Sequence, residues 1–217
     1  QCGRIMTARK IVAIHQPNYL PWLGYFHKIA AADIFVFLDD VPFSKGSYIN
    51  RVKILANGQG RWLSVPVSVH LGDPINRVAV AKPNWMNSHM ATLSGWYRDA
   101  SAFCQAWPRL SEILSAAPDA DLAAINRFLV EAISRELGLA CCFKASSDID
   151  VDELTGDERL IALTNSAAAG AVYLSGKGGA NYQNEEKFTA AGLKLRYTDY
   201  PHPVYPQAGG DADFVAG

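Results

Sequence analysis

The chain of 217 residues is long enough to bury a continuous hydrophobic core, and its 49% hydrophobic and 19% charged residues are ordinary for a globular protein. Twenty Lys and Arg residues against 21 Asp and Glu leave a formal net charge of −1, which excludes a global electrostatic footprint for nucleic acid or an anionic membrane. No apolar run approaches the roughly 18 to 20 residues of a membrane helix, and the N-terminus lacks the apolar centre of a signal peptide. We therefore expect no membrane span and, by default, a cytoplasmic location.

The first predicted elements are a strand, a helix and a second strand. Residues 11–15, IVAIH, are apolar and rich in β-branched side chains, as expected of a strand buried on both faces. Residues 21–32 fit a helix, with Pro21 in its first turn and apolar residues at helical spacing. Residues 33–40, DIFVFLDD, again have the composition of a buried strand, which ends in two carboxylates. Strand, helix and strand within roughly 30 residues predict a βαβ unit and therefore a parallel sheet.

The rest of the chain continues the alternation around a long helical stretch. The same criteria predict strands at residues 61–69, 75–81, 171–175 and 194–200, and helices within 84–139 and at 156–170. The neighbouring Cys141 and Cys142 are interpreted as buried strand residues. We expect one α/β domain over residues 11–217, with a mostly parallel Rossmann-like sheet and a helical insertion around residues 84–139. Residues 1–10 are interpreted as a terminal tail or an expression scar.

Polar and aromatic side chains crowd the loop between the first strand and its helix. In a parallel sheet, ligands lie beyond the carboxyl ends of the strands, where loops meet helix N-termini with free N–H groups. Pro17 and Pro21 restrict this loop, so its side chains can be held in place before a ligand arrives. The candidate site residues here are His15, Gln16, Asn18, Tyr19 and Trp22. The alternative is that His15 and Gln16 bond neighbouring loops while the aromatic rings cap the core.

Charged residues follow the second predicted strand and are expected at the same edge of the sheet. Asp39, beside Asp40, suits a metal, a proton or a substrate hydroxyl. The cations that suit phosphate or carboxylate are Lys45, Arg51 and Lys53. Asn50 and Arg51, in the stretch S-Y-I-N-R, are predicted to form a buried polar pair that needs partners. The alternative for the charged residues is a set of surface ion pairs, which contribute little.

Two later loops are further candidates. The stretch Y-L-S-G-K-G-G-A-N-Y follows a predicted strand, and its glycines with Lys177 could present N–H groups and charge to an anion. It matches neither the Walker A pattern nor G-x-G-x-x-G, and a flexible turn is the alternative. The substrate-binding candidates here are Ser175, Gly176, Lys177 and Tyr182. The proline-rich segment after the last strand adds His202, Tyr205 and Gln207, of which Tyr205 and Gln207 are substrate-binding candidates.

Neither a nucleophile elbow nor a metal-ligand cluster stands out in the sequence. The five histidines are scattered, and no Ser-His-Asp order or CxxC spacing occurs. We therefore predict no metal site. The cofactor stays unknown, with a nucleotide or an acyl donor as the candidates.

Several motifs together resemble the WbqC-like family. They are H-Q-P-x-Y-x-P-W-L-G-Y-F near the start, N-R-x-K-I, W-L-S-V-P-V, the glycine-containing stretch from Tyr173 to Tyr182, and a late Y-P-Q. The resemblance runs from about Ile11 to Gly217. It implies a bacterial protein of loci for O-antigen and other surface polysaccharides, with a role in modifying a sugar. It also implies that members continue into a further short helix, so we expect this chain to be shortened at its C-terminus.

A looser similarity connects the first helix and second strand with HIGH-type nucleotidyltransferases. In those enzymes a histidine pair at the start of the helix binds triphosphate. Here Trp22, Leu23, Gly24 and Tyr25 stand at the corresponding positions, so both histidines are missing. The similarity implies a related fold and puts adenylyl-transfer chemistry in doubt.

The resemblance and the candidate residues together predict a transferase that modifies a nucleotide-linked amino sugar by acyl or aminoacyl transfer in lipopolysaccharide biosynthesis. His15 would act as general base, because an imidazole of near-neutral pKa suits an amine proton. Asn50 and Arg51 would bind phosphate or a donor carboxylate, and the glycine loop with Lys177 would hold a diphosphate. The partner is a small molecule and not nucleic acid; the oligomeric state is left open.

Two alternatives keep the same fold. The first is a nucleotidyltransferase or adenylate-forming enzyme that binds ATP and Mg²⁺ near Asp39 and Lys45. The second is a non-catalytic protein that binds a sugar intermediate or scaffolds other enzymes.

Overall fold

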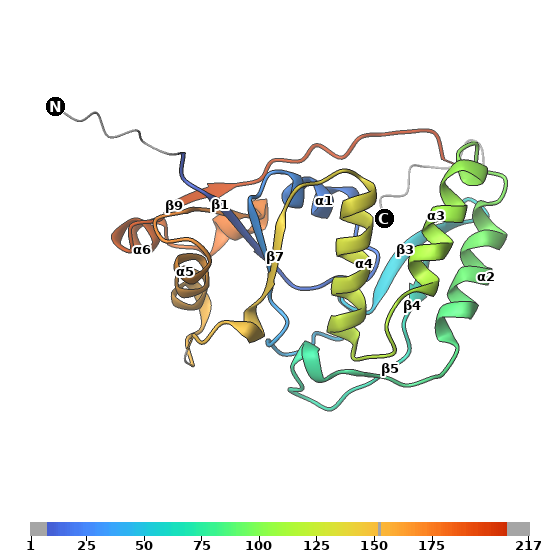
Figure 1. Ribbon diagram of the computed structural model, residues 1–217, viewed down its shortest axis with the longest axis horizontal. Coiled ribbons are helices and arrows are strands. Elements are labelled where there is room, and N and C mark those ends of the chain that lie inside the picture. The colour runs from blue at the N-terminus through green and yellow to red at the C-terminus, as the bar shows by residue number, and fades with distance from the viewer. Residues whose placement is uncertain (1–7, 152, 208–217) are drawn as a thin grey trace. The chain divides into compact units, whose positions relative to one another are not determined.

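The computed structural model describes residues 8–151 and 153–207, and these fold into two compact units. The first unit contains residues up to 15, residues 27–38 and residues 140–200; the second contains residues 16–26, 39–139 and the segment from 201 onward. Figure 1 colours the chain along its length and labels most of the helices and several strands of both units. Most of the predicted terminal tail and the expected C-terminal shortening lie outside the described residues.

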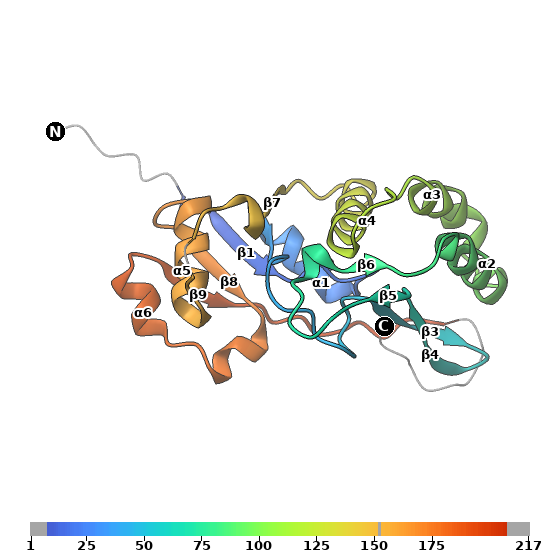
Figure 2. The same cartoon turned by 90° about the horizontal axis from the view of Figure 1, so that it is seen from below.

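The first unit is built on a five-stranded parallel sheet (Figure 2). Its strands are β1 (Ile11–His15), β2 (Ile34–Phe37), β7 (Cys142–Ala145), β8 (Val172–Ser175) and β9 (Lys194–Tyr197). They lie in the order β7-β2-β1-β8-β9, and every neighbouring pair is parallel. Numbered along the chain within this sheet, the order is 3-2-1-4-5, which is the Rossmann arrangement. The predicted Rossmann-like α/β fold is confirmed.

Apolar side chains cover both faces of the central strand, as its composition predicts. Val12 and Ile14 face a core shared with helices α5 (Gly156–Ala167) and α6 (Glu185–Ala190), which supply Leu163 and Phe188. On the opposite face of the strands, the rings of Phe35, Phe37 and Phe143 are in contact. Two short 3-10 helices, η2 (Ser146–Asp148) and η3 (Lys177–Asn181), follow β7 and β8.

The strand β7 corrects the expectation for the two adjacent cysteines. Cys142 is exposed and Cys141 is half-buried. β7 stands at one edge of the sheet and pairs only with β2, so its first residues lack a covering strand on one side. The apolar composition was a correct indication of a strand but a wrong indication of full burial.

The second unit contains two small antiparallel sheets, one of which begins in a segment that the sequence did not predict as a strand. β3 (Arg51–Ala56) and β4 (Gln59–Ser64) form a hairpin, and β5 (Val67–Ser68) pairs with β6 (Ala79–Val80). The hairpin turns at Asn57 and Gly58, which have φ values of 50° and 71°, as a two-residue turn of this kind requires. The expected strand over 61–69 is divided at Pro66, and residues 75–77 of the other expected strand form the 3-10 helix η1 (Ile75–Arg77).

The helical insertion is confirmed and belongs to the second unit. Its helices are α2 (Trp85–Tyr97), α3 (Phe103–Ser115) and α4 (Leu122–Glu136), and α3 lies between the other two (Figure 1). Asp121 caps α4, accepting a hydrogen bond from the N–H of Ala124 at 2.9 Å. Buried residues of these helices, among them Leu93, Leu114 and Leu129, share a core with the inner face of β3.

Helix α1 (Leu23–Ala30) begins among residues of the second unit and ends among residues of the first. Its Gly24 leaves no space for a side chain, because a Cβ atom at this position would clash with the indole ring of Trp22. The W-L-G sequence therefore lets the Trp22 ring fold back over the start of its own helix.

Candidate functional site

The sheet of the first unit has a topological switch point between β1 and β8. From β1 the chain builds β2 and β7 on one side, and later adds β8 and β9 on the other. Loops that leave the carboxyl ends of two such strands run in opposite directions and open a crevice, where ligands of this fold class bind. His15 ends β1 and Ser175 ends β8, so both predicted candidates flank this crevice within the first unit.

His15 is half-buried at the end of β1. Its backbone carbonyl accepts a hydrogen bond from the N–H of Leu38 at 2.8 Å, just beyond the end of β2. That bond fixes the backbone from which the imidazole projects. Because successive residues of a strand bond alternately to its two neighbours, the carbonyl of Ile14 faces the other side, toward β8.

Lys28 occupies that side and is a residue that the sequence did not single out. Its Nζ donates to the carbonyl oxygen of Ile14 at 2.8 Å, and the side chain is only 5% exposed. Burial lowers the pKa of Lys28 to about 7. Within the described part of the chain no carboxylate pairs with this amine. An amine with three donor positions and one protein acceptor therefore lies at the point where β1 and β8 separate.

The loop after β8 combines one glycine that the fold requires with two that it does not. A Cβ at Gly179 would clash with Ser175 Oγ and Gln183 Oε1, so this glycine is needed for packing. At Gly176 and Gly178 a Cβ would meet no atom of the described chain within 4 Å, and neither residue has a positive φ. Steric conflict within the chain therefore does not explain why glycine occupies these two positions. The missing side chains leave space beside the loop.

Two other predicted residues of this loop are exposed. The ammonium of Lys177 pairs with Asp199 at 3.2 Å on the surface, and both side chains are more than 80% exposed. Such a pair contributes little and opens readily, so it does not prevent Lys177 from meeting an anion. Tyr182 is 75% exposed.

In the second unit, the predicted loop residues Asn18 and Tyr19 are buried. The Tyr19 side chain is 0% exposed, and its hydroxyl lies 2.8 Å from Nδ1 of His89. Nε2 of His89 lies 3.1 Å from the carbonyl oxygen of Ser64, so the imidazole bridges two segments. Burial lowers the pKa of His89, which favours the neutral ring that can accept at one nitrogen and donate at the other. Tyr19 is thus a core residue, and its partner is His89, which the sequence did not single out.

Asn126 is a second buried connection that the sequence did not indicate. Its Nδ2 donates to the carbonyl oxygens of Pro17 and Ile49 at 2.9 and 2.7 Å, and the residue is 0% exposed. The amide therefore joins the H-Q-P loop to the segment before β3. Gln16 also lies in this loop, and its carbonyl accepts a hydrogen bond from the Tyr25 hydroxyl at 2.9 Å.

Of the candidates after β2, Asp39 and Asn50 have partners within the second unit. Asp39 is 2% exposed and lies 3.5 Å from the guanidinium of Arg127. Asn50 donates from Nδ2 to the carbonyl of Val65 at 3.1 Å, closing the base of the β3–β4 hairpin. The sequence predicted that Asn50 needs a polar partner, and that partner is the backbone carbonyl of Val65. Lys45 is exposed.

Arg51 lies on the outer face of β3 together with Lys53. Its guanidinium stacks on the indole of Trp62, 4.0 Å from the ring centroid, and donates to the carbonyl of Gly46. Lys53 stands opposite Trp62 in the hairpin register. These contacts hold the Arg51 side chain in one orientation.

Trp22 and the segment after β9 come together in the second unit. The Trp22 indole stacks on the His202 ring, with centroids 5.9 Å apart and planes 11° apart, and His202 in turn stacks on Tyr205. Gln207 is half-buried at the end of the described chain. The sequence placed these residues in two separate candidate loops, and the structure brings Trp22, His202 and Tyr205 into one aromatic group.

No three His, Cys, Asp or Glu side chains gather into a possible metal site anywhere in residues 8–151 and 153–207. Of the helices in that part of the chain, none has the length and apolar character needed to cross a membrane.

Comparison with known proteins identifies the family. The model of the WbqC-like protein family matches residues 16–217. The chain is also 32% identical over 193 residues to a protein of Mycobacterium tuberculosis (strain ATCC 25618 / H37Rv) that is named "Uncharacterized protein Rv1507c"; the match covers 88% of this chain and 83% of the relative. No solved structure matches the chain. The chain therefore belongs to the WbqC-like protein family.

Proposed function

We propose that this protein is a transferase that modifies a nucleotide-linked amino sugar by acyl or aminoacyl transfer, in the biosynthesis of O-antigen or a related bacterial surface polysaccharide. The observation that carries the proposal is the chemistry at the switch point of the first unit. A histidine, a buried amine and two unobstructed glycines lie where sheets of this order bind nucleotides.

The nucleotide diphosphate occupies the crevice between β1 and β8. Gly176 and Gly178 allow its oxygens to approach the backbone, and Lys28 in its charged form offers two further N–H donors. The attraction between a buried ammonium and a bound anion is strong, because water screens the pair little. Lys177 adds surface charge that draws the anion to the loop.

His15 is the general base of the proposed reaction. The sugar amine attacks the carbonyl carbon of the acyl donor, and a new C–N bond forms. The imidazole removes the proton of the attacking nitrogen and returns it to the leaving group, which departs with the electron pair of the broken bond. Within the second unit, Arg51, already oriented by Trp62 and Gly46, is a candidate for binding a carboxylate. Asn50 is a positioning residue at the base of the same hairpin.

A panel of ligands tests this proposal. Thermal unfolding is measured with nucleotide-linked amino sugars, ATP with magnesium, and acyl-CoA. A ligand at about 100 times its Kd adds roughly 2.7 kcal/mol to stability, which is readily detected. We expect stabilisation by a nucleotide-linked amino sugar, and the stabilising sugar becomes the substrate for turnover assays. His15→Ala should keep the stabilisation and lose turnover by about 10²- to 10⁴-fold.

A nucleotidyltransferase or adenylate-forming enzyme is the second candidate, because the same sheet order and the Lys28 amine also suit a triphosphate. Asp39, the residue expected to hold ATP-bound Mg²⁺, is engaged by Arg127. Exchange of labelled pyrophosphate into ATP would favour this candidate over acyl transfer. Sugar binding that survives with no turnover in either assay would favour the binding or scaffold protein.

A further inference from the structure

The second unit contains a pocket that none of the predicted roles explains. Its volume is about 490 Å³, within the range of roughly 300 to 1,000 Å³ that small-molecule sites occupy. The walls come from the loop at residues 20–23, from β3, from α2 and α3, and from His202 and Tyr205. All of these residues belong to the second unit, so the pocket is complete within it.

The lining is predominantly apolar. Aliphatic side chains on one side include Leu20, Leu23, Val52, Leu93 and Leu110. Small residues, Ala102 just before α3 and Ala106 in its first turn among them, also line the space. Apart from Lys53, the described lining contains no charged side chain, which disfavours a cationic or strongly polar occupant.

Stacked rings form the other walls. Trp22 stacks on His202, and Phe103 stacks on Trp107 with centroids 5.3 Å apart. One face of each ring is thus covered by its partner. The lining also lacks the Asn, Gln and carboxylate side chains that usually read the edges of a nucleobase. A flexible aliphatic chain fits these walls better than a second planar ring does.

Tyr97 is one of two tyrosines that line this predominantly apolar pocket, the other being Tyr205. The Tyr97 oxygen accepts a hydrogen bond from the N–H of Leu55 at 3.0 Å, and no acceptor for its own proton occurs among the described residues. Burial, and then the neighbouring Tyr205, raise the pKa of Tyr97, so its hydroxyl keeps the proton. A carbonyl or hydroxyl oxygen of a ligand is a suitable acceptor.

We infer that this pocket binds an aliphatic acyl chain whose oxygen accepts a hydrogen bond from Tyr97. At about 30 Å³ for each non-hydrogen atom, taking the share of one water in the liquid, the volume holds roughly 10 to 16 such atoms. This corresponds to a chain of medium length. Identifying the chain with the group that is transferred rests on the proposed function; the binding itself does not.

Three carboxylates of equal charge test the inference: decanoate, butyrate and 1-naphthoate. Their affinities are measured by calorimetry. We expect decanoate to bind at least tenfold more tightly than either butyrate or 1-naphthoate. Equal or tighter binding of 1-naphthoate would show a site for planar rings and overturn the inference, as would an absence of decanoate binding.

Variants of α3 locate the binding. Ala106 lines the pocket and is exposed, so Ala106→Trp fills the space with little effect on the core. We expect this change to reduce decanoate affinity at least tenfold. Gln105→Trp, on the same helix but outside the lining, is the matched control and should keep the wild-type affinity. If Ala106→Trp alters the fold by circular dichroism, Tyr97→Phe replaces it, with an expected loss of about threefold to tenfold. Unchanged affinity in the folded variants overturns the inference.

The outcomes separate this inference from the proposed function. Decanoate binding without stabilisation by any nucleotide-linked sugar supports the acyl pocket and contradicts the proposed transferase. Stabilisation of the protein by a nucleotide-linked sugar without decanoate binding supports the proposed transferase and contradicts the acyl pocket. His15→Ala, which lies in the first unit, should leave decanoate binding unchanged.

Discussion

The two units differ in where their candidate residues have unused hydrogen-bonding capacity. In the first unit, groups with unused bonding capacity gather at one edge of the sheet, where Lys28 has a single protein acceptor and two glycines face open space. In the second unit, several polar residues that the sequence singled out are bonded internally, among them Tyr19 and Asn50, although Nε of Arg51 and Oδ1 of Asn126 are buried there without a hydrogen-bond partner among the described residues. Unused bonding capacity at an open sheet edge therefore points to a ligand site, whereas a single unbonded atom inside a packed core, such as Oδ1 of Asn126, does not.

This contrast changes the interpretation of the H-Q-P motif. The motif begins with His15 at the sheet edge of the first unit, and its next residues are anchored in the second unit by Asn126 and His89. The motif thus contains both the His15 imidazole, which is the proposed reactive group, and the residues that fix the loop in place. Rigidity comes from specific hydrogen bonds as well as from the two prolines.

The largest expected effect in the scaffold is that of Asn126→Ala. The change leaves the buried carbonyls of Pro17 and Ile49 without a donor, which should cost roughly 2 to 4 kcal/mol of stability. Urea unfolding gives the value. Asn87→Ala, at an exposed position of α2, is the control and should change stability by less than about 0.5 kcal/mol. Equal effects of the two changes would contradict the anchoring role.

The buried amine of Lys28 predicts the direction in which folding stability changes with pH. Its folded-state pKa of about 7 lies below the unfolded value of about 10.4, so the unfolded chain binds more protons between these values. Stability should therefore rise as the pH increases from about 7 toward 10, by up to about 1.4 kcal/mol per pH unit from this group. Lys28→Met should remove that rise. Urea unfolding of both proteins at several pH values checks it, and parallel curves would show that Lys28 is not the source.

The same residue predicts a pH dependence of ligand binding. The proposed phosphate contact needs the charged amine, so affinity for the nucleotide should fall as the pH rises above about 7. Lys28→Met should bind weakly at every pH and lose this dependence. Calorimetric titrations between pH 6 and 9 make the comparison, and wild-type affinity in the variant would exclude Lys28 from the site.

A smaller effect is expected from Tyr19→Phe. The change removes one buried hydrogen bond to His89 and should cost about 1 kcal/mol. Ligand binding should stay within a factor of two, because the hydroxyl is buried in the core. Tyr48→Phe, at an exposed ring, is the control. Loss of ligand affinity with unchanged stability would return Tyr19 to the list of binding residues.

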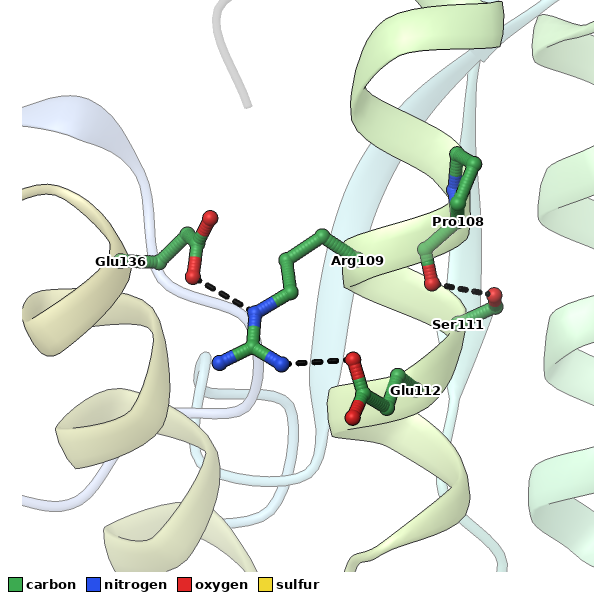
Figure 3. A network of polar contacts seen from close by, with 5 residues as sticks. All are labelled: Pro108, Arg109, Ser111, Glu112 and Glu136. Carbon is green, nitrogen blue, oxygen red and sulfur yellow. Dashed lines mark hydrogen bonds and ion pairs between the residues drawn. The ribbon is translucent and has the colours of Figure 1, made fainter.

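The smallest effect is expected on the surface of the second unit. Arg109 on α3 bonds both Glu112 and Glu136, at 2.5 and 2.7 Å, and so links α3 to α4 (Figure 3). All three side chains are about half or more exposed, so water screens the pairs. Arg109→Ala should cost less than about 1 kcal/mol, and high salt should reduce the difference further. A loss above 2 kcal/mol in thermal unfolding would contradict this estimate.

The parallel sheet could be predicted because the composition of each strand is visible within its own short stretch of sequence. The buried runs at residues 11–15 and 172–175 are read from composition, and the position of their ends follows from parallel pairing. The β3–β4 hairpin was missed although Asn57-Gly58 is a strong turn signal, because the charged residues on its outer face concealed the strand pattern. Pro66 likewise divides what composition alone presents as one strand.

The partners of the site residues could not be predicted in the same way. Asn126 bonds carbonyls that lie 77 and 109 positions away in the chain, and His89 bonds a hydroxyl 70 positions away. The local sequence pattern around each residue does not indicate such long-range contacts. Lys28 was overlooked because a lysine in a short helix is usually solvated, and only the three-dimensional structure shows that its amine is buried against β1.

The most direct test of the account is nucleotide-sugar binding by wild type, Lys28→Met and His15→Ala, measured by calorimetry at pH 6.5. The account predicts that wild type and His15→Ala bind a nucleotide-linked amino sugar with similar affinity, that Lys28→Met binds at least tenfold more weakly, and that only the wild type turns it over. Equal binding by all three proteins, or binding of ATP with magnesium in place of the sugar, would contradict the placement of a nucleotide-sugar at the switch point.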